Sequence, residues 1–164
     1  MGTMYNDEAS LYRACFDACR DQPWRVVMAV GHRVDRSLLP APPANVLVLD
    51  YVAQVDLLAR ANLFITHGGI NSAHEAMWHG VPMIVLPRAA DHHIVAARVA
   101  DAGAGVVLDR SQATSDRLRD LSARVLADAG CRERAAQLGV TLREAGGPAR
   151  AADLIQHVTS RKDA

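Results

Sequence analysis

The sequence has little of what marks a nucleic-acid-binding or membrane-spanning protein. Its 18 Lys and Arg residues are balanced by 18 Asp and Glu residues, so the formal net charge is zero. This balance removes the positive electrostatic footprint that a nucleic-acid-binding surface requires. No apolar run approaches the roughly 18 residues that a membrane-spanning helix needs, and no secretory signal is recognisable. We therefore expect a cytoplasmic protein without nucleic-acid or membrane partners.

Cysteine is also scarce, and its spacing excludes the usual cysteine chemistry. The chain has three cysteines, Cys15, Cys19 and Cys131. They form no even-numbered disulfide framework and include no C-x-x-C pair. Cys15 and Cys19 lie one helical turn apart on an expected helix. Small buried side chains are therefore favoured over a redox or metal-binding role.

What the chain does contain is enough apolar sequence for one compact domain. Its 164 residues are 50% hydrophobic and 22% charged, an ordinary globular balance. Short β-branched runs alternate with amphipathic stretches, which predicts an α/β fold: a Rossmann-like parallel sheet flanked by helices. We expect a single domain over 1–164 with no internal linker.

The expected elements follow from this alternation. A proline-rich surface loop is expected over 35–45, and breaks between the last helices are expected at Gly130 and at 146–148. The expected strands are 25–30, 46–50, 63–66, 83–86 and 105–108. The expected helices run from 6 or 7 to 20, over 55–61, 71–79 and 92–102, and through most of 114–161.

One strand-turn-helix segment carries the chemistry. Between 64 and 75, an apolar strand ends, two glycines make a turn and a helix begins. Ligands of open parallel sheets bind at the carboxyl ends of the strands. A helix N-terminus there offers free N–H groups and roughly half a positive charge, and glycines let a phosphate approach the backbone. The segment therefore predicts a phosphate site.

The polar side chains of the segment extend this prediction. His67 can donate to a phosphate oxygen, and Asn71 and Ser72 add donors in the first helical turn. Glu75 lies one turn further on the same face as Asn71, where a carboxylate can accept both hydroxyls of a ribose. A strand-Gly-Gly-helix turn alone can be purely structural. The combination of His, Gly-Gly, Asn-Ser and Glu at these spacings is much more specific.

This stretch resembles the donor-binding motif of family 1 glycosyltransferases, which have the two-domain GT-B fold. The motif H-x-G-x-N-S-x-x-E, then G-V-P, then P and an acidic residue, is matched by His67, Gly69, Asn71, Ser72, Glu75, Gly80, Val81, Pro82, Pro87 and Asp91. The upstream W-V-P-Q element of the family is similar to Tyr51-Val52-Ala53-Gln54, and Gly2-Thr3 resembles the end of the first strand of the C-terminal domain. Gly31–Asp35 and Glu144–Gly147 resemble the bacterial macrolide subgroup.

The resemblance implies a role for each matching residue. The residues that would hold the diphosphate are Thr3, His67, Gly68, Gly69, Asn71 and Ser72. Glu75 would bind the ribose. The base would meet Tyr51, Val52 and Gln54. The donor sugar would meet Asp91 and His92.

Two positions depart from the family pattern. Tyr51 replaces the usual tryptophan, and its smaller ring can still stack on a base. His92 replaces the glutamine that normally follows the acidic residue, which leaves the donor sugar open. His74 and His79 flank Glu75 as H-E-x-x-x-H, which is not the zinc spacing H-E-x-x-H. We expect no metal and no cofactor; a UDP- or dTDP-sugar is a substrate.

The resemblance also implies what the chain does not supply. In the family, the catalytic base and the acceptor site belong to an N-terminal domain, so no catalytic residue is expected within 1–164 and the isolated chain is expected to be inactive. The chain is then the donor-binding half of an inverting enzyme that moves a hexose to a hydroxyl of a macrolide or similar natural product.

Two other interpretations stay open. The chain could be a stand-alone nucleotide-binding module or one subunit of a split transferase. It could also be a relative of the sugar-nucleotide 2-epimerases, which 51–54 and 67–75 argue against. In a full-length or split transferase the acceptor domain would act in cis or in trans, and an exposed interdomain surface could support a homodimer.

Overall fold

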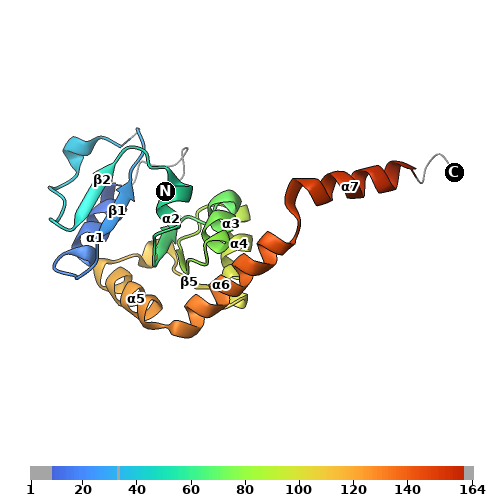
Figure 1. Ribbon diagram of the computed structural model, residues 1–164. Coiled ribbons are helices and arrows are strands. Elements are labelled where there is room, and N and C mark those ends of the chain that lie inside the picture. Colours follow the sequence, from blue (N-terminus) through green and yellow to red (C-terminus); the bar gives the residue numbers. More distant parts are fainter. Residues whose placement is uncertain (1–8, 33, 161–164) are drawn as a thin grey trace.

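The computed structural model describes residues 9–32 and 34–160 (Figure 1). The elements in chain order are α1 (Ala9–Cys19), β1 (Val26–Ala29), the 3-10 turn η1 (Arg36–Leu38), β2 (Val46–Leu49), α2 (Gln54–Leu58), β3 (Phe64–Thr66), α3 (Ile70–Trp78), β4 (Met83–Val85), α4 (Ala90–Asp101), β5 (Gly105–Val107), the 3-10 turn η2 (Arg110–Gln112), α5 (Ser115–Ala127), α6 (Ala129–Glu144) and α7 (Gly147–Ser160). The predicted α/β class is confirmed. The expected helix start at 6 or 7 and the strand end at Gly2-Thr3 lie outside the described residues.

The described strands form two parallel sheets rather than one. β1 pairs with β2, and Val26 lies opposite Val46. β4 lies between β3 and β5, with Phe64, Met83 and Gly105 in register. The carboxyl ends of β3, β4 and β5 therefore meet at one edge, where the sequence places its polar motif.

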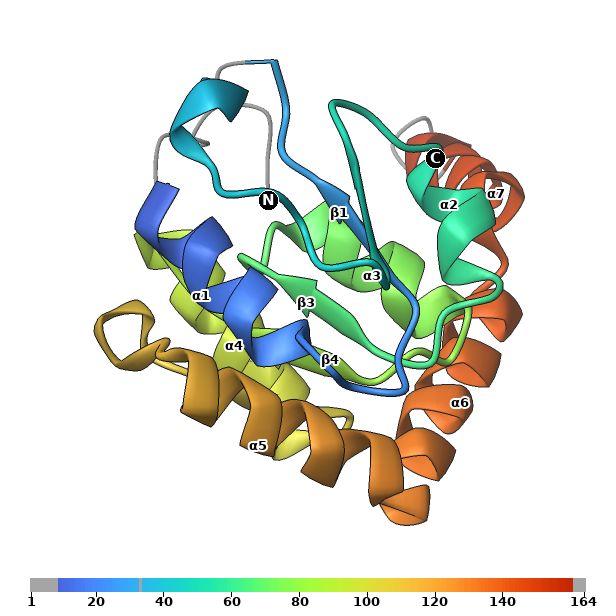
Figure 2. The same ribbon diagram turned by 90° about the vertical axis from the view of Figure 1, so that its left-hand side faces the viewer.

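Helices cover both faces of the three-stranded sheet. β4 shows how, because its side chains alternate between two core clusters. Met83 and Val85 are buried against α2, α3 and α4, whereas Ile84 and the following Leu86 are buried against α1 and α5. This period of two is the geometry of a strand buried on both sides. Figure 2 shows α1 and α5 in front of β3 and β4, with α3 behind them.

The predicted helix break is present, but it lies at Asp128 rather than at Gly130, and the reason is a helix cap. α5 ends at Ala127 and α6 begins at Ala129, so Gly130 lies inside the first turn of α6. Asp128 makes the junction: its side chain accepts the backbone N–H of Cys131 at 2.9 Å. A side-chain acceptor at this position satisfies a helix N–H that has no partner within the helix. The expected break at 146–148 is confirmed, because α6 ends before Gly146.

We expect Asp128→Ala to destabilise the domain by about 1 kcal/mol through the loss of this cap. The 3.9 Å ion pair between Asp128 and Arg134 is half-exposed and adds little. Urea unfolding of the two proteins measures the difference. Asp120→Ala is the matched control, since Asp120 is exposed and has a 3.9 Å ion pair with Arg124. Equal losses in the two variants would contradict the cap.

The cysteines pack as predicted. Cys19 and Cys131 are buried, and Cys15 is half-buried on the same helix as Cys19. Burial raises the pKa of Cys15 to about 12 and also raises the pKa of Cys19 and of Cys131. Since the thiolate is the reactive form, these are unreactive packing residues.

The last helix differs from the rest in having no buried residue. α7 extends away from the body of the domain (Figure 1). It exposes three apolar side chains, those of Leu154, Ile155 and Val158. No helix within the described ranges combines the length and the apolar character that crossing a membrane requires.

Candidate functional site

The turn after β3 is built around one glycine. Gly68 has φ +88°, a left-handed conformation that costs any residue with a Cβ. A Cβ added to Gly68 would lie 2.8 Å from Val85 Cγ1 and 3.2 Å from the carbonyl oxygen of His92. The backbone N–H of Gly68 donates to Oγ1 of the buried Thr66 at 3.3 Å. The turn is therefore tight, and it packs closely against Val85 of β4 and His92 of α4.

The start of α3 is open to an anion. Gly69 is the N-cap residue, and it has no side chain with which to accept the first N–H groups of the helix. Ile70 and Asn71 are exposed at this end. Uncapped N–H groups and the helix dipole together favour a negatively charged ligand. The predicted phosphate position is thus at an accessible helix N-terminus at the carboxyl edge of the sheet.

Three predicted ligand contacts come together beside this end of α3. Nε2 of Gln54 donates to Oγ of Ser72 at 3.0 Å and to Oε2 of Glu75 at 2.7 Å. Gln54 is the first residue of α2, whereas Ser72 and Glu75 lie three residues apart on one face of α3. All three are half-buried. We call these three residues the polar cluster.

His67 lies between the turn and α4. Its ring is close enough to Gly69 that a Cβ there would be 2.7 Å from His67 Nε2. Nδ1 of His67 is buried and has no hydrogen-bond partner among the residues that the structure describes. Burial, with a smaller contribution from His92, lowers the pKa of His67 to about 4. The imidazole is therefore neutral in the ligand-free domain near pH 7.

His92, in the first turn of α4, packs against His67. The two rings meet edge to face, with centroids 4.6 Å apart and an interplanar angle of 76°. His92 is only 9% exposed, and its Nδ1 accepts the backbone N–H of Ala89 at 3.2 Å. Asp91 next to it is exposed over 76% of its side chain, and its Oδ2 lies 3.9 Å from His92 Nε2.

The remaining residues of the predicted site are Tyr51, Val52 and Thr3. Tyr51 and Val52 follow β2; Tyr51 is 77% exposed, and Val52 is half-buried. Thr3 lies outside the described residues. The sequence prediction overlooked that the hydroxyl of Thr66 accepts a backbone N–H within the turn, although a hydroxyl two residues before a glycine turn is a recognisable signal. It also overlooked the cap that His92 gives to α4, for which the third helical position was the signal.

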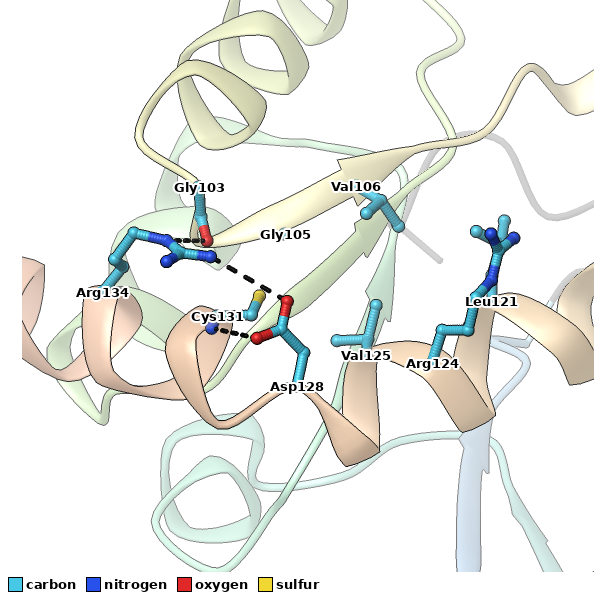
Figure 3. Close-up of a pocket in the computed structure, with 9 residues that line it drawn as sticks. All are labelled: Gly103, Gly105, Val106, Leu121, Arg124, Val125, Asp128, Cys131 and Arg134. Carbon is cyan, nitrogen blue, oxygen red and sulfur yellow. Dashed lines mark hydrogen bonds and ion pairs between the residues drawn. The ribbon is translucent and has the colours of Figure 1, made fainter.

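A separate groove lies at the opposite edge of the sheet (Figure 3). Its volume is about 270 Å³, and it is lined by Gly103, Gly105, Val106, Leu121, Arg124, Val125, Asp128, Cys131 and Arg134. The polar groups across it bond to one another: Arg134 Nε donates to the carbonyl oxygen of Gly103 at 2.9 Å, and Asp128 pairs with Arg134. The groove begins at the amino end of β5, away from the polar cluster.

The described part of the chain contains no group of three or more His, Cys, Asp or Glu side chains placed to hold a metal ion. The candidate site combines a helix N-terminus, a neutral histidine and the polar cluster.

Residues 15–156 match the family described as the Erythromycin biosynthesis protein CIII-like, C-terminal domain. The chain belongs to this family. The resemblance to the C-terminal half of bacterial macrolide-type GT-B glycosyltransferases, stated from the sequence motifs, is thereby confirmed. This EryCIII-like domain extends over nearly all of the described residues.

Similar proteins are much longer than this chain. Demethyllactenocin mycarosyltransferase of Streptomyces fradiae is 36% identical over 160 residues, which is 98% of this chain and 35% of that protein. The structure of CalG4, the calicheamicin glycosyltransferase, is similar with a TM-score of 0.91 at 34% identity, over 98% of this chain and 42% of that one. The chain thus spans about two fifths of the length of these relatives.

One similar structure holds a nucleotide. The glycosyltransferase VinC in complex with dTDP matches 80% of this chain and 33% of its own, with a TM-score of 0.74 at 28% identity. The nucleotide belongs to that structure.

Proposed function

We propose that this EryCIII-like domain binds the nucleoside diphosphate of an activated sugar as the donor half of a natural-product glycosyltransferase. The observation that carries the proposal is the polar cluster of Gln54, Ser72 and Glu75 beside the open N-terminus of α3. The polar cluster offers hydrogen-bonding groups suited to a nucleoside, and the start of α3 beside it offers N–H groups suited to a diphosphate. The names of the relatives and the dTDP held by VinC support the same substrate class.

The residues around the start of α3 divide between the diphosphate and the ribose. The diphosphate lies on the N–H groups that follow Gly69, flanked by Asn71 and Ser72, and His67 donates to one of its oxygens. Glu75 accepts from the ribose hydroxyls. Because Gln54 already bonds to Ser72 and Glu75, it spans the diphosphate and nucleoside ends of the site.

The base and the sugar lie at opposite ends of this arrangement. Tyr51, Val52 and Gln54 take the base, where the exposed ring of Tyr51 is free to stack. Asp91 takes hydroxyls of the transferred sugar, a role that its exposed carboxylate permits.

The domain's contribution to chemistry is electrostatic. Displacement of the nucleoside diphosphate from the anomeric carbon develops negative charge on the leaving phosphate. Fixed N–H groups and the helix dipole aimed at that phosphate stabilise the charge as it forms. The acceptor and the base that deprotonates it belong, in this proposal, to a second domain that acts in cis or in trans. The acceptor is a hydroxyl of a macrolide or similar natural product.

The exposed apolar face of α7 supports a partner of this kind. Leu154, Ile155 and Val158 lie on a helix that has no buried residue. The relatives have more than half of their length outside the matched region, which is enough chain to form the second domain. A second copy of the chain is the alternative occupant of this face.

Calorimetry with UDP and with dTDP tests the proposed site. We expect at least one nucleotide to bind weakly, and we expect His67→Ala and Glu75→Ala to weaken it by about tenfold each, or ~1.4 kcal/mol. Asp56→Ala is the matched control, because Asp56 is an exposed carboxylate on α2. The isolated chain is expected to transfer no sugar in a product assay.

The outcomes separate the parts of the proposal. Failure of both nucleotides at millimolar concentration would reject nucleotide binding by the isolated domain. Binding that survives both substitutions would show that the nucleotide lies elsewhere. Sugar transfer by the chain alone would reject the assignment of the base to a second domain.

A further inference from the structure

The residue after Asp91 is the unusual one in this site. The family pattern places glutamine there, and this chain has His92. A residue that binds a sugar hydroxyl should present its polar atoms to the ligand. His92 is instead 9% exposed, and its Nδ1 is already bonded to the backbone N–H of Ala89. The neutral ring therefore carries its proton on Nε2, with only that atom left for another partner.

The contacts of His92 point inward, to the turn that follows β3. Its ring meets the ring of His67 edge to face at 4.6 Å, an arrangement that aromatic rings favour. Its backbone forms one wall of the turn, since a Cβ on Gly68 would be 3.2 Å from the carbonyl oxygen of His92 and 3.6 Å from its Cβ. His92 thus contacts two consecutive residues of the turn.

We propose that His92 is a positioning residue for His67: anchored by its bond to Ala89, it holds the His67 imidazole over Gly69, where the proposed diphosphate binds. The identity of the ligand in this inference rests on the proposed function, whereas the contact between His92 and His67 does not. The bond to Ala89 fixes the ring of His92 because it restrains both the position and the rotation of the imidazole.

The anchor matters because His67 has little else to orient it. Nδ1 of His67 has no hydrogen-bond partner within the described residues, so its ring is held by packing. The charged or titratable groups that act on His67 from its described surroundings are His92 and Asp91 of α4 and Arg110 after β5. Of these, His92 has the direct ring contact.

Two substitutions separate the anchor from the ring contact. His92→Asn keeps a side-chain acceptor for the N–H of Ala89 and removes the ring that meets His67. His92→Phe keeps a ring and removes the acceptor. His92→Gln, the family residue, is a second variant of the first kind. His93→Asn is the control, since His93 is exposed on the same helix turn.

The decisive measurement is the pKa of His67 in the ligand-free chain, followed by NMR of its ring protons, together with calorimetry with UDP and dTDP. We expect His92→Asn and His92→Gln to move the pKa of His67 from about 4 back toward 6.5, because its ring loses cover. We expect the same variants to weaken nucleotide binding by about tenfold. His92→Phe should keep the pKa of His67 low and bind more tightly than His92→Asn, with a lower melting temperature from the lost cap.

Each other result counts against the proposal. An unchanged pKa of His67 in His92→Asn and His92→Gln would overturn it. Weaker binding with an unchanged pKa would mean that His92 contacts the ligand itself. A greater loss of binding in His92→Phe than in His92→Asn would assign the effect to the cap of α4. If the native chain binds neither nucleotide, the proposed function fails, while the titration of His67 still decides whether His92 positions it.

Discussion

Replacing Gly68 with alanine is expected to destabilise the domain by about 2–4 kcal/mol and to remove nucleotide binding. Two costs combine at this position. A Cβ is strained at φ +88°, and it would lie 2.8 Å from Cγ1 of Val85, the buried last residue of β4. Neither Val85 nor the backbone of His92 can move without disturbing the core or the start of α4. Urea unfolding and calorimetry measure the two effects.

Gly147→Ala separates these costs. Gly147 also has a positive φ, +52°, but no atom lies within 4 Å of the position its Cβ would take. Its substitution should cost only the conformational strain, about 1 kcal/mol. If the two alanine variants lose the same stability, the close packing of the turn is not what makes Gly68 necessary.

Gly69→Ala tests the site rather than the fold. Gly69 has φ −59°, which any residue adopts, and its added Cβ would meet the ring of His67 rather than the backbone. A side chain can move, so the stability of this variant should stay near that of the native chain. Its nucleotide affinity should fall, because His67 no longer lies over the start of α3.

Nucleotide affinity is expected to rise by up to about tenfold per pH unit as the pH falls from 7 toward 5, through proton uptake by His67. Burial keeps the pKa of free His67 at about 4. A bound diphosphate favours the charged imidazole and raises that pKa. Between the two values the complex holds a proton that the free protein does not, so lower pH favours binding.

His67→Gln provides the control for this prediction. The terminal phosphate of the nucleotide itself gains a proton near pH 6, which affects the native chain and the variant alike. The ratio of the two affinities isolates the contribution of His67. A ratio that stays constant between pH 7 and pH 5 would contradict the placement of His67 against the diphosphate.

The lowered pKa of His67 in the folded chain has a different consequence for stability: a lower pH destabilises the fold. Above pH 6.5, the ordinary value for histidine, His67 is neutral in both states and contributes nothing to the pH dependence. Between pH 6.5 and about 4, the unfolded chain binds a proton at His67 and the folded chain does not. The free energy of unfolding therefore decreases as the pH decreases. Below pH 4 the loss is constant. The native chain should therefore lose more stability than His67→Gln between pH 7 and pH 5 in urea titrations.

The local signals in this sequence predict most of its helices and strands. Strands such as Met83–Val85 are short apolar runs between turn residues, and hydrophobic periodicity identifies them without reference to the rest of the chain. The break between α5 and α6 shows the limit of such signals. A glycine at 130 looked like a helix end, but the acceptor of Asp128 two residues earlier determines where α6 begins.

The segment from 67 to 75 was the central element of the family resemblance, because turn, helix start and polar spacing are all local to one stretch of chain. Its contacts with the rest of the molecule were decided only by the tertiary structure. Gln54 reaches Ser72 and Glu75 because α2 packs beside α3, and His92 meets His67 because parallel strands bring the ends of β3 and β4 to one edge. Pair contacts of this kind depend on packing between segments distant in sequence. The sequence alone could therefore propose a set of ligand-binding residues, and the tertiary structure decided which of them contact each other.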